Sequence, residues 1–419
     1  MTVVRLALQS LRNRWLTAGL TILAIAVSVV LLLGVEKIRH AAKASFANTI
    51  SGTDLIMGAR SGGIQLLLYS VFRIGNATNN VSWRSYEHIA ARPEVDWIVP
   101  LTLGDSHRGF RVMGTSRAYF DRYRYGQGRP LQFAQGKPFA DLFDAVIGSD
   151  VAEALGYKLG DRLVVTHGQG VIPGAEHDDK PFRVSGILRK TGTPVDRTIH
   201  VSMAGYEAIH LDWQTGVRDP TRSITAERAR QMDLKPSTLT AALIGLKSKL
   251  MTFQLQRYIN EYRSEPLLAI LPGITLYELW DLVSTAETAL VIVSMMVVIT
   301  AILGMITMIL ATLNERRREI AILRSVGAGP RTIIGLLVAE ASILTVAGVA
   351  IGALATYVLL LAARPAVEAA YGLYLDVAAP TPRELWGIAA IVVGGALAGL
   401  LPAWRAYRLS LADGMMVRT

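Results

Sequence analysis

Histidine offers the broadest chemistry in this sequence, and all seven histidines lie between residues 36 and 285. Imidazole and carboxylate groups together suit a zinc ion, and imidazole also titrates near neutral pH. The best candidate for such a site is His177 with Asp178 and Asp179. However, no two histidines have the short spacing of a metal-ligand motif. We therefore assign no metal site, and a metal or pH-sensing site stays as a less favoured hypothesis. The histidines are His40, His88, His107, His167, His177, His200 and His210.

Motifs for hydrolysis and nucleotide binding are absent from the sequence. It contains no GxxxxGK[ST] phosphate loop, no HExxH, no GxSxG and no cysteine. The glycine-rich GARSGG at residues 58–63 lacks the lysine and the spacing of a phosphate loop, so we interpret it as a flexible loop. We predict no catalytic residues, no cofactor bound by this chain, and no ATPase or hydrolase activity of its own.

The stretch NERRREIAILRSVGAGP, residues 314–330, combines charge with an ordered apolar pattern. If it is helical, Ile320, Leu323 and Val326 share one face by their spacing. The glycines and the proline at residues 327–330 would then end the helix and turn the chain. We predict a short amphipathic helix at a membrane surface. A simple topology anchor would explain its arginines, but not its interleaved glutamates or its apolar face.

Four apolar runs surround this stretch, and each is long enough to cross a membrane as a helix. Hydrophobic residues make up 51% of the chain and charged residues only 18%, below the roughly 25% of soluble domains. The first run has twenty residues, which is too long for the apolar part of a signal peptide, so we expect a retained anchor. The predicted transmembrane helices are residues 16–35, 286–313, 333–363 and 385–404.

Basic residues in the short flanks set the expected orientation. The tails 1–15 and 405–419 carry three each and the segment 314–332 carries five, whereas the loop 364–384 carries two. We predict that both tails and the segment 314–332 are cytoplasmic, and that the loop 364–384 is extracytoplasmic. The net charge of +10 is then a topology signal, so membrane lipids are expected as partners and nucleic acid is not.

We predict that residues 36–285 form a large domain outside the cytoplasm, inserted between the first two spans. Short β-type runs separated by turn signals recur from TDLIMG at 53–58 to TIHVSM at 198–203. From about residue 205 the pattern favours helix, and ITLYELWDLVSTAE at 274–287 leads directly into the second span. The predicted fold class is an α-helical membrane protein with four transmembrane helices plus a large mixed α+β extracytoplasmic domain.

ERRREIAILRSVGA, residues 315–328, resembles the signature of the MacB/FtsX-like permeases, the membrane subunits of a class of ABC transporters. RPEVDWIVPL, FRVMGTSRAYF, VIGSDVAEALGYKLGDRLVV and FRVSGIL resemble the exterior domain of that family in the same order. LPAWRAYRLSLADGMMVR resembles its C-terminal end, with Ser410-Leu411 where a proline dipeptide is common and Gly414-Met415 where Ala-Leu is common.

The resemblance implies a mechanism called mechanotransmission, in which an ATPase subunit pushes on the permease and the exterior domain moves. It implies a separate ATPase subunit that binds ATP and magnesium, and a second permease copy that forms a homodimer. It also implies the bacterial inner membrane, a periplasmic exterior domain, and a periplasmic adaptor or substrate-binding protein as a further partner. The coupling residues that match the family motif are Glu315, Arg316, Arg317, Arg318, Glu319, Ile320, Leu323, Arg324, Gly327 and Ala328.

Two GxxxG patterns mark close helix packing, either within one protomer or at a dimer seam. They are formed by Gly348 with Gly352 and by Gly395 with Gly399. The favoured function is a permease that drives export or extraction of a substrate at the outer face of the inner membrane. Two alternatives stay open: an FtsX-like transmembrane regulator of an envelope enzyme, and a metal-linked envelope protein.

Overall fold

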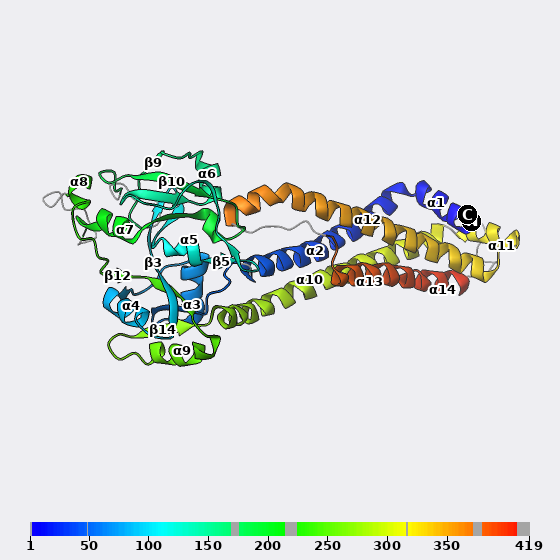
Figure 1. Ribbon diagram of the computed structural model, residues 1–419. Coiled ribbons are helices and arrows are strands. Elements are labelled where there is room, and N and C mark those ends of the chain that lie inside the picture. The colour runs from blue at the N-terminus through cyan, green and yellow to red at the C-terminus, as the bar shows by residue number, and fades with distance from the viewer. Residues whose placement is uncertain are drawn as a thin grey trace. The chain divides into compact units, whose positions relative to one another are not determined.

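The computed structural model describes residues 2–47, 49–168, 176–213, 224–315, 317–371 and 379–408 (Figure 1). The chain divides into two compact units. The helical unit contains residues 1–41, 284–367 and 375–419, and the α/β unit contains residues 42–283 and 368–374.

The helical unit is built from long apolar helices whose inward faces share one core. Ile25, Met305, Leu337 and Ile391 are buried in that core, whereas large apolar side chains elsewhere on the helices are exposed, as a lipid-facing surface requires. Among the described residues, four helical stretches are long and apolar enough to cross a membrane: Trp15–Ala41, Pro272–Ala311, Arg331–Val367 and Pro382–Arg405. The helices are α1 (Thr2–Asn13), α2 (Trp15–Ala47), α10 (Pro272–Glu315), α11 (Arg317–Ser325), α12 (Pro330–Tyr371), α13 (Pro382–Ala398) and α14 (Leu400–Arg408).

Helix α10 runs without a break for 44 residues. The segment 274–287, which was expected to lead directly into the second span, therefore belongs to the same helix. Its only proline is Pro272 at the first position, where a missing N–H costs no helical hydrogen bond. At 1.5 Å per residue, a helix of this length extends roughly 66 Å.

Helix α1 occupies most of the N-terminal tail, for which the sequence analysis predicted no secondary structure. The other end of the helical unit differs from the sequence prediction. The fourth apolar run is not one helix, because it is broken at Gly399 between α13 and α14. Pro402 explains this break, since it has no N–H to donate to Ala398, and its ring crowds that carbonyl. Residues 409–419, including Ser410-Leu411 and Gly414-Met415, lie outside the described residues.

The α/β unit is organised by a ten-stranded mixed sheet in the order β14-β1-β13-β3-β4-β11-β8-β10-β7, with β9 paired to β10. The pairs β10–β8 and β11–β4 are parallel, and the other pairs in this sheet are antiparallel. The strands are β1 (Leu55–Ala59), β3 (Val95–His107), β4 (Phe110–Thr115), β7 (Phe133–Gly136), β8 (Asp144–Ile147), β9 (Arg162–Leu163), β10 (Phe182–Leu188), β11 (Thr198–Ser202), β13 (Ala241–Leu246) and β14 (Leu267–Ile270).

Short helices cover this sheet and close three separate apolar cores. Two further strand pairs lie outside the main sheet: β2 (Val81–Ser82) with β12 (Thr238–Leu239), and β5 (Arg124–Tyr125) with β6 (Arg129–Pro130). The core helices are α3 (Gly63–Leu67), η1 (Leu68–Phe72) and α5 (Ala118–Arg122) in the first core, α6 (Ser149–Leu155), α7 (Met203–His210) and α8 (Ala226–Ala229) in the second, and α4 (Trp83–Ala90) and α9 (Thr252–Asn260) in the third.

Each of the β-type runs predicted between residues 53 and 203 contains a strand of this sheet, but three of its strands were missed: β7, β13 and β14. Strand β13 lies between β1 and β3 and is buried at Ala241–Gly245, so its sequence lacks the polar–apolar alternation of a half-exposed strand. Strands β13 and β14 both lie after residue 205, where helix was expected. The segment 58–63 is also not a loop throughout, because Gly58 belongs to β1 and Gly63 begins α3.

Candidate functional site: a charged helix, its turn and the bundle that holds them

The charged stretch folds as helix α11 followed by a tight turn, as predicted. Gly327 has φ +97°, a left-handed conformation that side chains strongly disfavour. Its N–H donates to the Arg324 carbonyl at 3.0 Å, and the Ala328 N–H donates to the Leu323 carbonyl at 2.9 Å. These two bonds form a Schellman motif, and Pro330 then begins α12 at the position that proline favours. The turn therefore fixes the direction in which α12 leaves α11.

The apolar side chains of α11 do not share one face in the predicted way. Ile320 is only 6% exposed and belongs to the core of the bundle, while Leu323 is half-buried. Val326 is 82% exposed, because it follows the last helical residue. Ile322 is also exposed, and the Val326 N–H donates to its carbonyl at 3.1 Å. Ile320 thus anchors α11, while Ile322 and Val326 leave large apolar side chains exposed.

Several predicted coupling residues are only partly described by the structure. Glu319 is exposed and Arg324 is half-buried, whereas Gly327 and Ala328 form the turn. Arg316 lies outside the described residues, as do the side chains of Glu315, Arg317 and Arg318.

The first GxxxG pattern lies where α12 crosses α2. A Cβ atom on Gly348 would lie 2.7 Å from Cβ of Ile25, and one on Gly352 would lie 2.6 Å from the carbonyl oxygen of Ala26. Both distances are too short for any side chain. The two glycines therefore allow backbone contact between helices of the same chain.

The second GxxxG pattern lies against α12. A Cβ atom on Gly395 would lie 2.1 Å from Oγ1 of Thr345, and one on Gly399 would lie 2.8 Å from Cβ of Ala341. Thr345 cannot easily turn away, because its hydroxyl donates to the Ala341 carbonyl at 2.8 Å. The helices α2, α12 and α13 are thus packed too closely at these points to accept an added methyl group.

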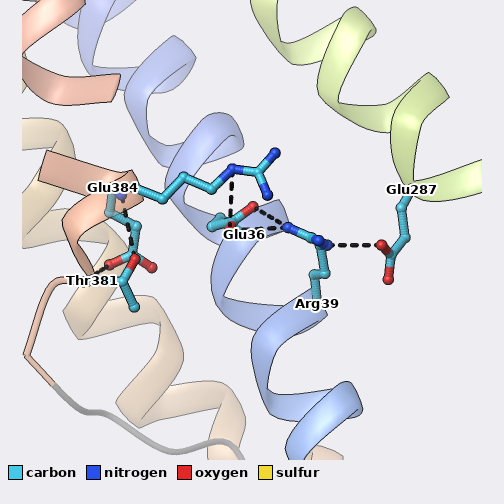
Figure 2. A network of polar contacts seen from close by, with 6 residues as sticks. Glu36, Arg39, Glu287, Thr381 and Glu384 are labelled. Carbon is cyan, nitrogen blue, oxygen red and sulfur yellow. Dashed lines mark hydrogen bonds and ion pairs between the residues drawn. The ribbon is translucent and has the colours of Figure 1, made fainter. Parts of the chain in front are cut away.

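A polar network, which the sequence analysis did not assign, ties α2 to α10 and α13 (Figure 2). Arg39 on α2 donates from Nε to Glu287 on α10 at 2.7 Å and from Nη1 to Glu36 at 3.1 Å. Thr381 and Glu384 form a capping box that starts α13. The sequence signal was available, because these residues lie at the ends of apolar runs, where charged groups were interpreted only as boundaries.

Lys37 and Glu384 form a buried ion pair beside this network. Their charged atoms are 3.2 Å apart, and their side chains are 7% and 1% exposed. Removing one partner of such a pair typically costs about 3–5 kcal/mol, because the other charge stays buried. The pair therefore fixes α13 against α2 at the end of the bundle that lies opposite α11 along the helices.

A second constellation lies wholly within the α/β unit. Asp105 on β3, His167 after β9, His177 before β10 and His210 at the end of α7 each offer a ligand atom, and these atoms lie within 4.8 Å of one another. The predicted candidate, His177 with Asp178 and Asp179, contributes only its histidine. The sequence could not identify Asp105, His167 and His210 as partners, because only the sheet and α7 bring them together.

Two family comparisons match successive parts of the chain. Residues 18–241 match the MacB-like periplasmic core domain, which is more than half of the chain, and residues 291–411 match the FtsX-like permease C-terminal family. The chain belongs to the MacB/FtsX-like ABC permease family. The predicted resemblance is thereby confirmed, and the family and the four apolar helices together indicate a multi-pass inner-membrane permease with a periplasmic-type domain.

Two curated relatives of the permease are exporters by name. The pyoverdine export ATP-binding/permease protein PvdT of Pseudomonas syringae pv. tomato is 26% identical over 337 residues, which are 76% of this chain and 45% of that protein. The macrolide export ATP-binding/permease protein MacB of Nitrobacter winogradskyi is 33% identical over 113 residues, which are 27% of this chain and 17% of that protein. The matched regions span less than half of the length of each relative.

Two solved structures are weakly similar to the permease. The periplasmic region of MacB from Actinobacillus actinomycetemcomitans has a TM-score of 0.34 and 11% identity, over 56% of this chain and 95% of that one. The extracellular domain of the ABC-type transporter YknZ from Gram-positive bacteria has a TM-score of 0.31 and 13% identity, over 52% of this chain and 99% of that one. At these scores the likenesses establish neither the fold nor the function of the permease.

Proposed function

We propose that this chain is the permease subunit of an ABC exporter and transmits ATP-driven movement of an ATPase subunit to its periplasmic α/β unit. The observation that carries the proposal is α10, which runs unbroken from Pro272, just after strand β14, to Glu315, just before α11. A helix without an internal proline resists bending, so a displacement at one end is passed along its axis. The work is export or extraction of a substrate at the outer face of the inner membrane.

The entry point for this movement is α11. The exposed Ile322 of α11 and Val326, just after its end, contact the ATPase, while Ile320 holds the helix in the bundle. The Schellman turn prevents α11 from swinging freely relative to α12. A push on α11 therefore displaces the bundle as a body, and the close glycine contacts pass it to α2 and α13.

The membrane orientation follows from the distribution of positive charge. The two tails and the segment 314–332 together carry eleven basic residues, against two in the loop 364–384. Both termini and α11 are accordingly cytoplasmic, and the α/β unit is periplasmic.

The partners follow from a motif that the sequence lacks and from the names of the two curated relatives. No GxxxxGK[ST] occurs in these 419 residues, so ATP and magnesium bind elsewhere, and we place them on an ATPase subunit. Both curated relatives are named ATP-binding/permease export proteins, which favours export over regulation of an envelope enzyme. Two permease copies on two ATPase subunits complete the transporter, and a periplasmic adaptor or substrate-binding protein acts with the α/β unit.

Replacing Val326 with aspartate tests the docking role of α11. Val326 is exposed, so the change removes no core packing, but it places a charge in the apolar contact with the ATPase. We expect affinity for the ATPase to fall at least about tenfold, which corresponds to about 1.4 kcal/mol, and stimulation of its turnover to be lost. Co-purification and ATPase assays of the permease in nanodiscs measure both effects.

The matched control is Leu250→Asp, which makes the same kind of change at a 93% exposed residue of the α/β unit. It should leave ATPase binding unchanged. If Val326→Asp and Ile322→Asp both bind the ATPase as tightly as the natural protein does, α11 is excluded as the docking surface.

A further inference from the structure

The Asp105 cluster has distances close to those of a metal-binding shell. The carboxylate lies 3.1 Å from His210 Nε2 and 3.4 Å from His167 Nδ1, and these two nitrogens are 3.1 Å apart. Four ligands at about 2.0–2.1 Å from a tetrahedral zinc ion lie about 3.3 Å from one another. The distance between the two nitrogens, and the distance from each nitrogen to one oxygen of Asp105, Oδ2 for His210 and Oδ1 for His167, are thus within a few tenths of an ångström of this spacing.

His177 supplies the second, independent observation. Its side chain is fully buried, and neither ring nitrogen has a hydrogen-bond partner among the described residues. Buried polar atoms are nearly always satisfied, because leaving one without a partner costs about 1–3 kcal/mol. Its ring lies with its centroid 5.1 Å from that of His210 and 6.1 Å from that of His167. An unpartnered imidazole therefore faces the other potential ligands.

Ion pairing alone does not account for this arrangement. Burial would raise the pKa of Asp105, but hydrogen bonds from His167 and His210 hold it well below its usual range. Burial would lower the pKa of His210, but its bond with Asp105 raises it above the ordinary value. The side chain of His177 makes no hydrogen bond among the described residues, so pairing with Asp105 does not explain its position in the cluster.

Outer contacts orient the ligands as they do in protein metal sites. The Nδ1 of His210 donates to the Tyr206 carbonyl at 2.7 Å, which leaves Nε2 free to bind a metal. The Gly168 N–H donates to Oδ1 of Asp105 at 3.3 Å and fixes that carboxylate. Trp213 packs against the rings of His167 and His177 and excludes water from one side.

We propose that Asp105, His167, His177 and His210 bind one divalent transition-metal ion, with zinc the best match to three imidazoles and one carboxylate. This donor set is too rich in nitrogen for calcium or magnesium, which prefer oxygen ligands. Four protein ligands complete a tetrahedral shell, so the ion has a structural role. It joins β3, the segment after β9, the segment before β10 and the end of α7. The half-exposed His167 provides the route of entry.

The whole permease in detergent tests this proposal directly. After treatment with a chelator and its removal, it should bind one equivalent of zinc per chain in competition with a chromophoric chelator. Cobalt(II) bound at the same site should show the intense visible absorption of a tetrahedral complex. Replacing a residue that only holds a metal ligand in place typically weakens metal binding roughly 10- to 100-fold. His177→Gln and His167→Gln each remove a ligand, so each should weaken zinc binding by more than this.

His88→Gln is the matched control, because His88 is an exposed histidine of the same unit that contacts Tyr262. It should bind zinc as the natural protein does. If His177→Gln does not fold, His167→Gln decides the outcome, because its side chain is 40% exposed. Failure to bind one equivalent at micromolar zinc, or undiminished binding by His167→Gln, would overturn the proposal. Neither readout depends on ATPase coupling.

Discussion

Replacing Ala289 with proline is expected to uncouple the α/β unit from the ATPase while the two proteins still bind each other. Proline at this position removes the N–H that donates to the Thr285 carbonyl, and its ring crowds that carbonyl, at a cost of about 3 kcal/mol or more. The side chain of Ala289 is exposed, so no core contact is lost. The substitution lies far along α10 from α11, so the docking surface stays unchanged.

We expect the kinked helix to transmit less of the ATP-driven movement from the ATPase to the α/β unit. In the natural protein, ATP should change amide hydrogen exchange in the α/β unit when the ATPase is bound. In Ala289→Pro that change should fall at least about tenfold, within the range of typical coupling energies of about 1–3 kcal/mol. Ala289→Leu, which keeps the helix and adds only an exposed side chain, should respond as the natural protein does. A full exchange response in the proline variant would mean that α10 is not the route.

Adding one methyl group at Gly395 is expected to destabilise the helical unit. The new Cβ atom would lie 2.1 Å from Oγ1 of Thr345, whose hydroxyl is already bonded to the Ala341 carbonyl. Overpacking of this kind typically costs about 1–3 kcal/mol. Gly395→Ala should therefore lower the thermal unfolding midpoint in detergent and reduce ATPase stimulation, because α13 no longer packs against α12.

Gly304→Ala separates this effect from the general consequence of replacing a helical glycine. No atom lies within 4 Å of the Cβ that would be added at Gly304. Alanine there should be neutral or stabilise α10 by up to about 1 kcal/mol. Equal midpoints for Gly395→Ala and Gly304→Ala would show that the α12–α13 contact contributes nothing to the bundle.

Local patterns in the sequence were sufficient to predict the apolar helices, seven strands of the main sheet before residue 203 and the turn after α11. Each of these depends on residues close together in the chain, such as the glycines and the proline at 327–330. Strand β13 was missed because both of its faces are covered, which removes the alternation that identifies a strand. Val326 was placed on the helix face because spacing alone does not locate the last helical residue.

The contacts between distant segments could not be predicted in this way. Arg39 and Glu287 are 248 positions apart, and their pairing depends on how α2 and α10 pack. Asp105 and His210 come together only through the order of strands in the sheet and the position of α7. The sequence showed residues capable of such chemistry, but the fold decides which of them meet.

Labelling of single cysteines tests most directly the claim that force enters at α11 on one side of the membrane and leaves through the α/β unit on the other. The chain has no cysteine, so Ser325→Cys on α11 and Lys249→Cys in the α/β unit, both at exposed positions, report without background. In right-side-out membrane vesicles without the ATPase, an impermeant maleimide should label Lys249→Cys at once. It should label Ser325→Cys only after the membrane is permeabilised. Labelling of Ser325→Cys in sealed vesicles would contradict the account.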